Sequence, residues 1–155
     1  MQLYLILKSL HLVGVIMFIG NIAVTGWWKA MADRTRDPRI IAFAQRQVTL
    51  TDIVFTLGGV VLLGVSGAAS AVLGGIDMAT PWIKFGAMLF GAAGVVWLAI
   101  LVPVQTRLGR LARGFAAGGT IPDQYWRLER VWVIFGLIAT LLPLAAVPVM
   151  VFKAG

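Results

Sequence analysis

Long apolar runs alternate with shorter polar stretches along the chain. Four of the runs match the roughly 20 apolar residues that a helix needs to cross the hydrocarbon core of a bilayer. They cover residues 3–28, 50–73, 82–104 and 131–152. The pattern predicts an all-α integral membrane protein, a four-helix bundle that forms one domain over residues 1–155.

The composition agrees with a bilayer as the main solvent. Apolar residues make up 60% of the chain and charged residues 12%, whereas an average soluble domain is about half apolar and about a quarter charged. The sequence has no cysteine, which excludes disulfides, thiolate metal sites and c-type haem attachment. The first run lacks a basic start and a small-residue cleavage site, so we expect a permanent helix rather than a cleaved signal peptide.

Positive charge is concentrated in two of the three connections. These two connections carry ten cations: Lys29, Arg34, Arg36, Arg39, Arg46, Arg107, Arg110, Arg113, Arg127 and Arg130. Only Lys8, Lys84 and Lys153 are expected on the opposite side. Because basic loops remain in the cytoplasm, the asymmetry predicts a multi-pass protein of the bacterial inner membrane with both termini outside. The net charge of +7 then reflects topology and anionic lipid, and we expect no nucleic-acid binding.

The cytoplasmic ends of the helices are expected to extend beyond the bilayer. Asp37 and Pro38 form a typical helix start, so the second helix begins in the cytoplasm. The arginine-rich segment 107–115 continues the third helix until Gly118 and Gly119 end it, and Pro122 starts the fourth. Tryptophans are expected to mark the interfaces: Trp27, Trp28, Trp126 and Trp132 on the cytoplasmic side and Trp82 on the outer side.

Small residues on the second and third spans suggest how the helices pack. In lipid, small side chains let two helix backbones approach closely. The second span has two such pairs at four-residue spacing, and the third span has three small residues: Gly64 and Ala68, Gly67 and Ala71, then Ala87, Gly91 and Gly94. The pattern predicts a contact between the second and third spans.

Ionisable side chains inside a span are costly and therefore suggest a site. Lys8 and His11 lie one turn apart on one helix face. Lys84, two residues into the third span, lies on the same outer side. We expect these three side chains to meet in the outer half of the bundle. Asp52, near the cytoplasmic end of the second span, is expected to pair with a loop arginine.

His11 is the only histidine in the sequence, and Gly14 lies beside it on the helix. An imidazole next to a missing side chain leaves a flat slot, as a haem needs when a histidine holds its iron. The same pattern is compatible with a histidine that bonds to a hydroxyl or a backbone carbonyl. The sequence lacks paired carboxylates, a Ser-His-Asp set and a phosphate-binding loop.

Most of the chain resembles a bacterial family of inner-membrane proteins with a domain-of-unknown-function label. The segments that carry this resemblance are LKSLHLVGVIMFIGN, WWKAMADRTRDPRIIAFAQRQV, VPVQTRLGRLARGFAAGG and PDQYWRLERVWVIFGLIATLLPL. The resemblance implies a four-helix inner-membrane protein and no established activity.

Two shorter segments, LKSLH and PWIKF, are similar to HemJ-type protoporphyrinogen oxidases and, more broadly, to copper-resistance D-type membrane proteins. The HemJ family binds haem b and uses a histidine of the first helix with a lysine of the third. The resemblance implies that His11 ligates the iron, and that Lys84, with Lys8, holds a propionate or acts in proton transfer. The chain lacks that family's tyrosine-rich stretch and has Glu129 without the Asn and Pro of its Asn-Glu-x-Pro motif.

Three functions are therefore open. The first is a haem b protein with a redox or porphyrin-handling role, whose substrate is a porphyrinogen or a quinone from the lipid. The second is a carrier component for copper or a small solute, with Met17, Met78 and Met88 as thioether ligands. The third is a structural or assembly subunit without a ligand. A homo-oligomer is also left open.

Overall fold

The computed structural model describes residues 1–152 of the protein. Its helical segments are α1 (Gln2–Thr35), α2 (Pro38–Thr51), η1 (Asp52–Leu57), α3 (Gly58–Leu73), α4 (Pro81–Val96), η2 (Trp97–Leu101), α5 (Val102–Phe115) and α6 (Asp123–Phe152). The π-helical segments η1 and η2 join their neighbours without a break, so α2–η1–α3 and α4–η2–α5 are each one long helix. The all-α, four-helix prediction is confirmed. Lys153 lies outside the described residues.

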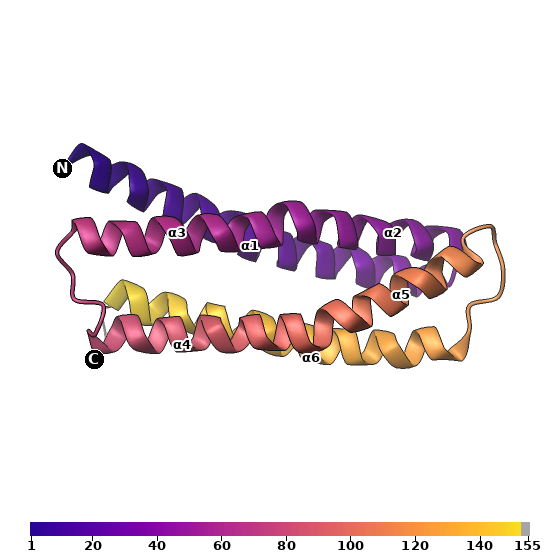
Figure 1. The fold of residues 1–155 in the computed structure, drawn as a ribbon. Helices are drawn as coiled ribbons and strands as arrows, with labels where there is room; N and C mark the ends of the chain where they lie inside the picture. Colours follow the sequence, from indigo (N-terminus) through magenta and orange to yellow (C-terminus); the bar gives the residue numbers. More distant parts are fainter. Residues whose placement is uncertain (153–155) are drawn as a thin grey trace.

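The four long helices form two pairs, each packed along its length. In the first pair α1 packs against α2, η1 and α3, and in the second pair α6 packs against α4, η2 and α5. The start of α1 and the end of α6 lie beside the α3–α4 connection, and we call this the terminal end (Figure 1). The opposite end holds the α1–α2 turn and the α5–α6 loop, and we call it the basic end. There α5 bends across to pack against α2.

All four long helices are long and apolar enough to cross a membrane. They run over Gln2–Thr35, Pro38–Leu73, Pro81–Phe115 and Asp123–Phe152. Large hydrophobic side chains such as Ile16, Val65 and Leu141 are exposed on their outer surfaces. Such a surface is suited to lipid and unsuited to water.

The helix boundaries follow the breakers in the sequence. The Asp37 carboxylate accepts hydrogen bonds from the backbone nitrogens of Arg39 at 2.8 Å and Ile40 at 3.4 Å, which confirms the predicted start of α2. The third long helix continues to Phe115, as predicted, and Gly118 follows with φ of 102°. That left-handed conformation is easily adopted by glycine and costly for other residues.

Glycines allow α1 and α3 to approach closely. A Cβ atom added to Gly14 would lie 2.6 Å from the backbone nitrogen of Leu63, and one added to Gly59 would lie 2.9 Å from that of Phe18. Neither position has room for a side chain, so the two backbones lie nearly in contact. The first pair is therefore held by the small-residue packing typical of membrane helices.

The predicted contact between the second and third spans is wrong. Within residues 1–152, no Cα atom of α3 lies within 8 Å of one in α4. Gly67 packs against α1 instead, while Gly64, Gly91 and Gly94 have open space at the Cβ position. The two-residue turn between α1 and α2 makes those helices antiparallel neighbours, so α3 presents Gly59 and Gly67 to α1.

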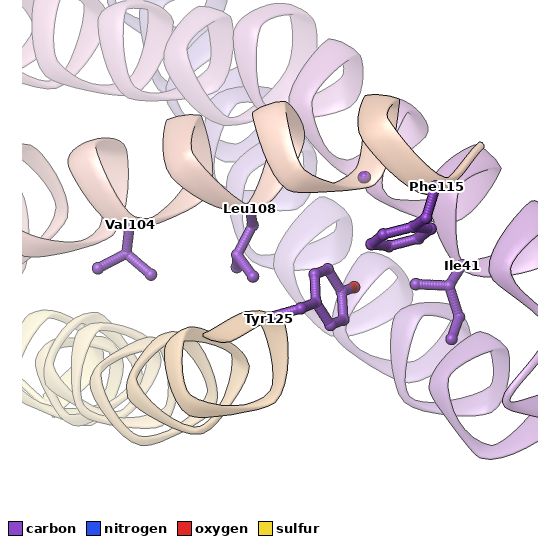
Figure 2. Close-up of a cluster of buried hydrophobic side chains, with 6 residues drawn as sticks. Ile41, Val104, Leu108, Phe115 and Tyr125 are labelled. Atoms are coloured by element: carbon purple, nitrogen blue, oxygen red, sulfur yellow. The ribbon is translucent and has the colours of Figure 1, made fainter. Parts of the chain in front are cut away.

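An apolar core of buried side chains lies at the basic end, where α2, α5 and α6 converge. Its buried members are Ile41, Val104, Leu108, Ala112, Phe115 and Tyr125. Figure 2 shows the Tyr125 ring between Leu108 and Phe115, with Ile41 reaching in from α2. The rings of Tyr125 and Phe115 meet edge to face, with centroids 5.3 Å apart. Because α2 belongs to the first helical pair and α5 and α6 belong to the second, this core holds the two pairs together.

Candidate functional site

His11 lies at the contact between α1 and α3. Its Nδ1 atom is 2.7 Å from the backbone oxygen of Leu63. Because a carbonyl oxygen only accepts, Nδ1 carries the hydrogen of this bond. A Cβ on Gly67 would lie 2.7 Å from Nδ1, so the imidazole packs directly on the α3 backbone. The structure thus shows the histidine-to-carbonyl bond that the sequence left as an alternative.

The space beside Gly14 does not form a slot. Leu63 fills it, because α3 approaches α1 most closely at this glycine. The expectation of a flat cavity between His11 and Gly14 is therefore wrong. The glycine serves the packing of two helices, and a single sequence cannot distinguish that use from the lining of a cavity.

Lys8 and Lys84 do not join His11. Both lysines are exposed, and among the described residues no Cα atom of α4 lies within 8 Å of one in α1. These helices belong to different pairs, so the expected meeting of the three side chains is not found. Met17 and Met88 are separated in the same way, on α1 and α4. Within residues 1–152, His and carboxylate side chains form no cluster of three that could hold a metal ion.

A cavity of about 600 Å³ lies between the two helical pairs. Phe18 and Phe90 line it from opposite pairs, with ring centroids 5.9 Å apart. Most of the wall is apolar, and η1 and η2 both contribute to it. The polar exceptions include Asp52, Thr56 and Gln105. The cavity therefore combines a large apolar volume with a cluster of polar groups on its wall.

Asp52 is the centre of this polar cluster. Its Oδ1 atom accepts hydrogen bonds from Asn21 at 3.2 Å and Thr56 at 3.0 Å, and its Oδ2 atom accepts one from Gln105 at 2.9 Å. The expected pairing with a loop arginine is wrong, because uncharged donors from α1, η1 and α5 surround the carboxylate. These bonds tie both helical pairs together at the cavity wall.

Trp132 completes the cluster. Its indole nitrogen donates to the Gln105 side-chain oxygen at 3.0 Å, and the ring lines the cavity. The sequence suggested only an interfacial role for Trp132, whereas here the side chain is half-buried. The bond fixes the Gln105 amide, with oxygen toward Trp132 and nitrogen toward Asp52. Since an amide nitrogen carries two hydrogens, Gln105 has a second hydrogen that these two bonds do not use.

A second polar cluster surrounds Lys29, nearer the basic end. Lys29 is only 1% exposed. Its Nζ atom lies 2.8 Å from Asp33 Oδ2, 2.9 Å from Glu129 Oε2 and 2.8 Å from the Tyr125 hydroxyl. The Tyr125 hydroxyl in turn donates to Asp33 Oδ1 at 3.3 Å. Lys29, which the sequence placed among the loop cations, is therefore a buried ion-pair partner between α1 and α6.

The sequence contains a signal for this second cluster that is visible only when two spans are compared. Lys29 and Asp33 are four residues apart on α1, and Tyr125 and Glu129 are four residues apart on α6. Residues at that spacing share a helix face. Two polar pairs of this kind at the same end of two spans indicate a shared buried site.

One family model matches nearly the whole chain. The family described as "Predicted integral membrane protein (DUF2269)" matches residues 5–154. The chain belongs to the DUF2269 family. No curated protein and no solved structure matches it. The family description and the four spans of this DUF2269 protein agree that it is an integral membrane protein.

In this DUF2269 protein the two polar clusters differ in what they offer. The Asp52 cluster faces a cavity large enough for a small molecule, and its carboxylate and amide can accept and donate hydrogen bonds. The Lys29 cluster is enclosed by helices and lines no part of that cavity. The geometry thus favours the cavity as the ligand site.

Proposed function

We propose that this protein binds a lipid-soluble quinone or quinol in the cavity between its two helical pairs. The observation that carries the proposal is the aromatic, largely apolar wall with the Asp52–Gln105–Trp132 cluster on it. Small-molecule sites have volumes of roughly 300–1,000 Å³ and combine apolar walls with a few polar groups. The cavity matches both criteria.

The chemistry of the polar cluster suits the head of such a molecule. The second amide hydrogen of Gln105 would donate to a quinone carbonyl, and the Asp52 carboxylate would accept from a quinol hydroxyl. The apolar ring and tail would lie against Phe18, Phe90 and Trp97. Entry from the lipid needs no aqueous route, because the ligand is itself soluble in the bilayer.

Porphyrins fit this cavity less well. Their propionates are anionic, and the residues that line the cavity include no lysine, arginine or histidine. The one ionisable group on the wall is Asp52, an acid that cannot compensate the charge of a carboxylate. Burying an uncompensated charge costs several kcal/mol. The lack of a cation among the residues that line the cavity therefore favours a neutral ring.

Tryptophan fluorescence gives a direct test, because Trp27, Trp97 and Trp132 line the cavity and quinones quench indole emission on contact. The purified protein in lipid nanodiscs is titrated with a short-tailed ubiquinone analogue, and saturable quenching is expected. Gly94→Phe should weaken binding at least about tenfold, equal to ~1.4 kcal/mol. The new ring fills the cavity, since a Cβ at Gly94 meets nothing within 4 Å.

Gly91→Phe is the matched control. Gly91 lies on the same helix and has the same open Cβ position, but it is exposed and lines no part of the cavity. Binding by Gly91→Phe should equal that of the wild type. Quenching that does not saturate, or that is unchanged in Gly94→Phe, would refute the quinone site.

A second candidate, haem b at His11, is favoured by the hydrogen bond that this side chain makes. Histidines that ligate metals commonly donate their other ring N–H to a backbone carbonyl, and His11 makes this bond to Leu63. Nε2 would then hold the iron. The surroundings of His11 fit a haem less well. Gly14 leaves no slot for the ring, and Lys8 and Lys84 are exposed side chains on different helical pairs.

An absorbance spectrum tests the haem proposal. The protein is purified from cells supplied with haem, alongside His11→Ala and Lys84→Ala. A Soret band that disappears in His11→Ala and weakens in Lys84→Ala is expected. A colourless wild type would exclude this proposal without affecting the quinone site. A protein that binds neither ligand would favour the structural or assembly role.

We further infer that the protein resides in a bacterial inner membrane with its terminal end outside. The support comes from the cations at the basic end. Apart from the buried Lys29, the cations expected there are all exposed: Arg34, Arg36, Arg39, Arg46, Arg107, Arg110, Arg113, Arg127 and Arg130. Exposed cations of this kind keep a loop on the cytoplasmic side.

A further inference from the structure

The buried cluster around Lys29 contains more negative than positive groups. Asp33 and Glu129 both contact the Lys29 ammonium, and Tyr125 adds a neutral hydroxyl. With both carboxylates ionised, the cluster would carry one uncompensated negative charge. Such a charge is costly in a low-dielectric interior unless it is paired or neutralised.

The neighbouring helices supply no further cation to this cluster. Arg36 stacks over the Trp126 ring at 4.2 Å and is exposed. The arginines of α2 and α5 are also exposed: Arg39, Arg46, Arg107, Arg110 and Arg113. On α6, Arg127 and Arg130 are exposed as well. Within residues 1–152, the groups that face Glu129 are therefore Lys29, Asp33 and Tyr125.

The hydrogen bonds indicate where a proton would sit. Lys29 uses its three hydrogens on Asp33, Glu129 and Tyr125, and both Asp33 oxygens accept hydrogen bonds. Glu129 Oε2 accepts from Lys29, whereas Oε1 accepts no hydrogen bond from any residue within 1–152. Glu129 is thus the carboxylate whose protonation disturbs no existing bond.

Gln45 supplies an independent indication of a ligand. It is 1% exposed, and neither its side-chain nitrogen nor its oxygen has a hydrogen-bond partner within residues 1–152. It lies one turn from Ile41 on the buried face of α2, and Ile41 packs in the same core as Tyr125. A cation would satisfy only the amide oxygen, whereas water both donates and accepts. Buried waters typically serve such groups.

We propose that the basic end of the bundle contains a proton-binding site, in which Glu129 carries a proton at Oε1 and exchanges it through water bound to Gln45. Uptake adds one proton to the carboxylate, and release returns it to the water, so no electron is transferred. The site lines no part of the quinone cavity, and the inference does not depend on that ligand.

The sequence offers an unusually direct test, because Glu129 is the only glutamate in the chain. Protein labelled with ¹³C at the glutamate side-chain carboxyl, reconstituted in lipid, reports this one group by solid-state NMR or infrared spectroscopy without any substitution. We expect the carboxylic acid signal at about pH 6, where a solvated glutamate is already ionised, and its replacement by the carboxylate signal in alkaline buffer. A carboxylate signal alone at about pH 6 would overturn the proposal.

A second measurement tests the water. Transfer into D₂O should replace the Glu129 proton quickly in the wild type and an order of magnitude more slowly in Gln45→Leu, which removes both amide groups. Gln47→Leu is the matched control, since Gln47 lies on the same helix but lines a surface groove. The Glu129 proton should exchange in Gln47→Leu at the wild-type rate. Equal rates in all three proteins would refute the role of Gln45.

Discussion

Single glycines set the distance between α1 and α3. A methyl group at Gly14 would meet the backbone of Leu63, whereas one at Gly20 would meet nothing within 4 Å. We expect Gly14→Ala to lower the free energy of unfolding by about 1–3 kcal/mol, the usual cost of overpacking. Gly20→Ala should raise it by roughly 0.5–1 kcal/mol, because alanine favours the helix. Thermal unfolding in detergent compares the two, and equal midpoints would contradict the α1–α3 contact.

Lys29 is the residue on which the buried cluster at the basic end depends. Lys29→Met should destabilise the protein by about 3–5 kcal/mol, since it removes the cation that contacts both Asp33 and Glu129 between α1 and α6. Arg34→Met, which removes an exposed cation five residues later, should change stability by less than about 0.5 kcal/mol. Denaturant unfolding in mixed micelles measures both. A Lys29→Met protein as stable as Arg34→Met would show that the ion pairs are not formed.

At the level of single residues, the sequence identified the ionisable side chains that are costly to bury. It did not identify the groups that bind them. His11 and Asp52 stood out because an ionisable group in an apolar run is rare. Their partners, the Leu63 carbonyl and the Gln105 amide, come from other helices and depend on helix pairing. Lys29 was misplaced because its charge resembled that of its loop neighbours. Only the antiparallel approach of α6 shows that the side chain is enclosed.

Helix ends, in contrast, are local and were predictable. Asp37→Ala should lower the free energy of unfolding by about 1 kcal/mol, since it removes the side-chain bonds to the first turn of α2. Asp37→Asn should retain most of this stability, because asparagine caps nearly as well. Hydrogen exchange at Arg39 and Ile40 localises the effect. Unchanged exchange in Asp37→Ala would contradict the cap.

The helices themselves followed from apolar runs and breakers, whereas their internal irregularities did not. The π-helical segments η1 and η2 contain no glycine or proline, and the apolar pattern of Asp52–Leu57 and Trp97–Leu101 does not signal them. Both segments line the cavity. π-helical turns recur at functional sites, so these irregularities are consistent with a ligand site that the hydrophobic pattern alone could not reveal.

For the whole molecule, the order of the helices was clear from sequence but their pairing was not. A two-residue turn forces α1 and α2 together, whereas the connection over residues 74–80 allows α4 to lie away from α3. Small residues at Gly64 and Gly91 suggested the wrong neighbours, because such residues also occur on surfaces that face lipid. The cavity is a consequence of this pairing, since it lies between two helical pairs that meet closely only at the basic end.

The orientation of the bundle in the membrane is a property of the molecule as a whole. The nine exposed arginines lie at the basic end, so that end should face the cytoplasm and both termini the outside. Alkaline phosphatase, active only outside, should be active when fused after Gly155 or Gly75 and inactive after Gly118. Green fluorescent protein, fluorescent only inside, should give the reverse pattern. The Gly75 fusion is the control for the C-terminal one, because Gly75 follows α3 at the end of the bundle where α6 ends. Phosphatase activity after Gly118 would invert the topology and would place the Lys29 cluster near the outer surface.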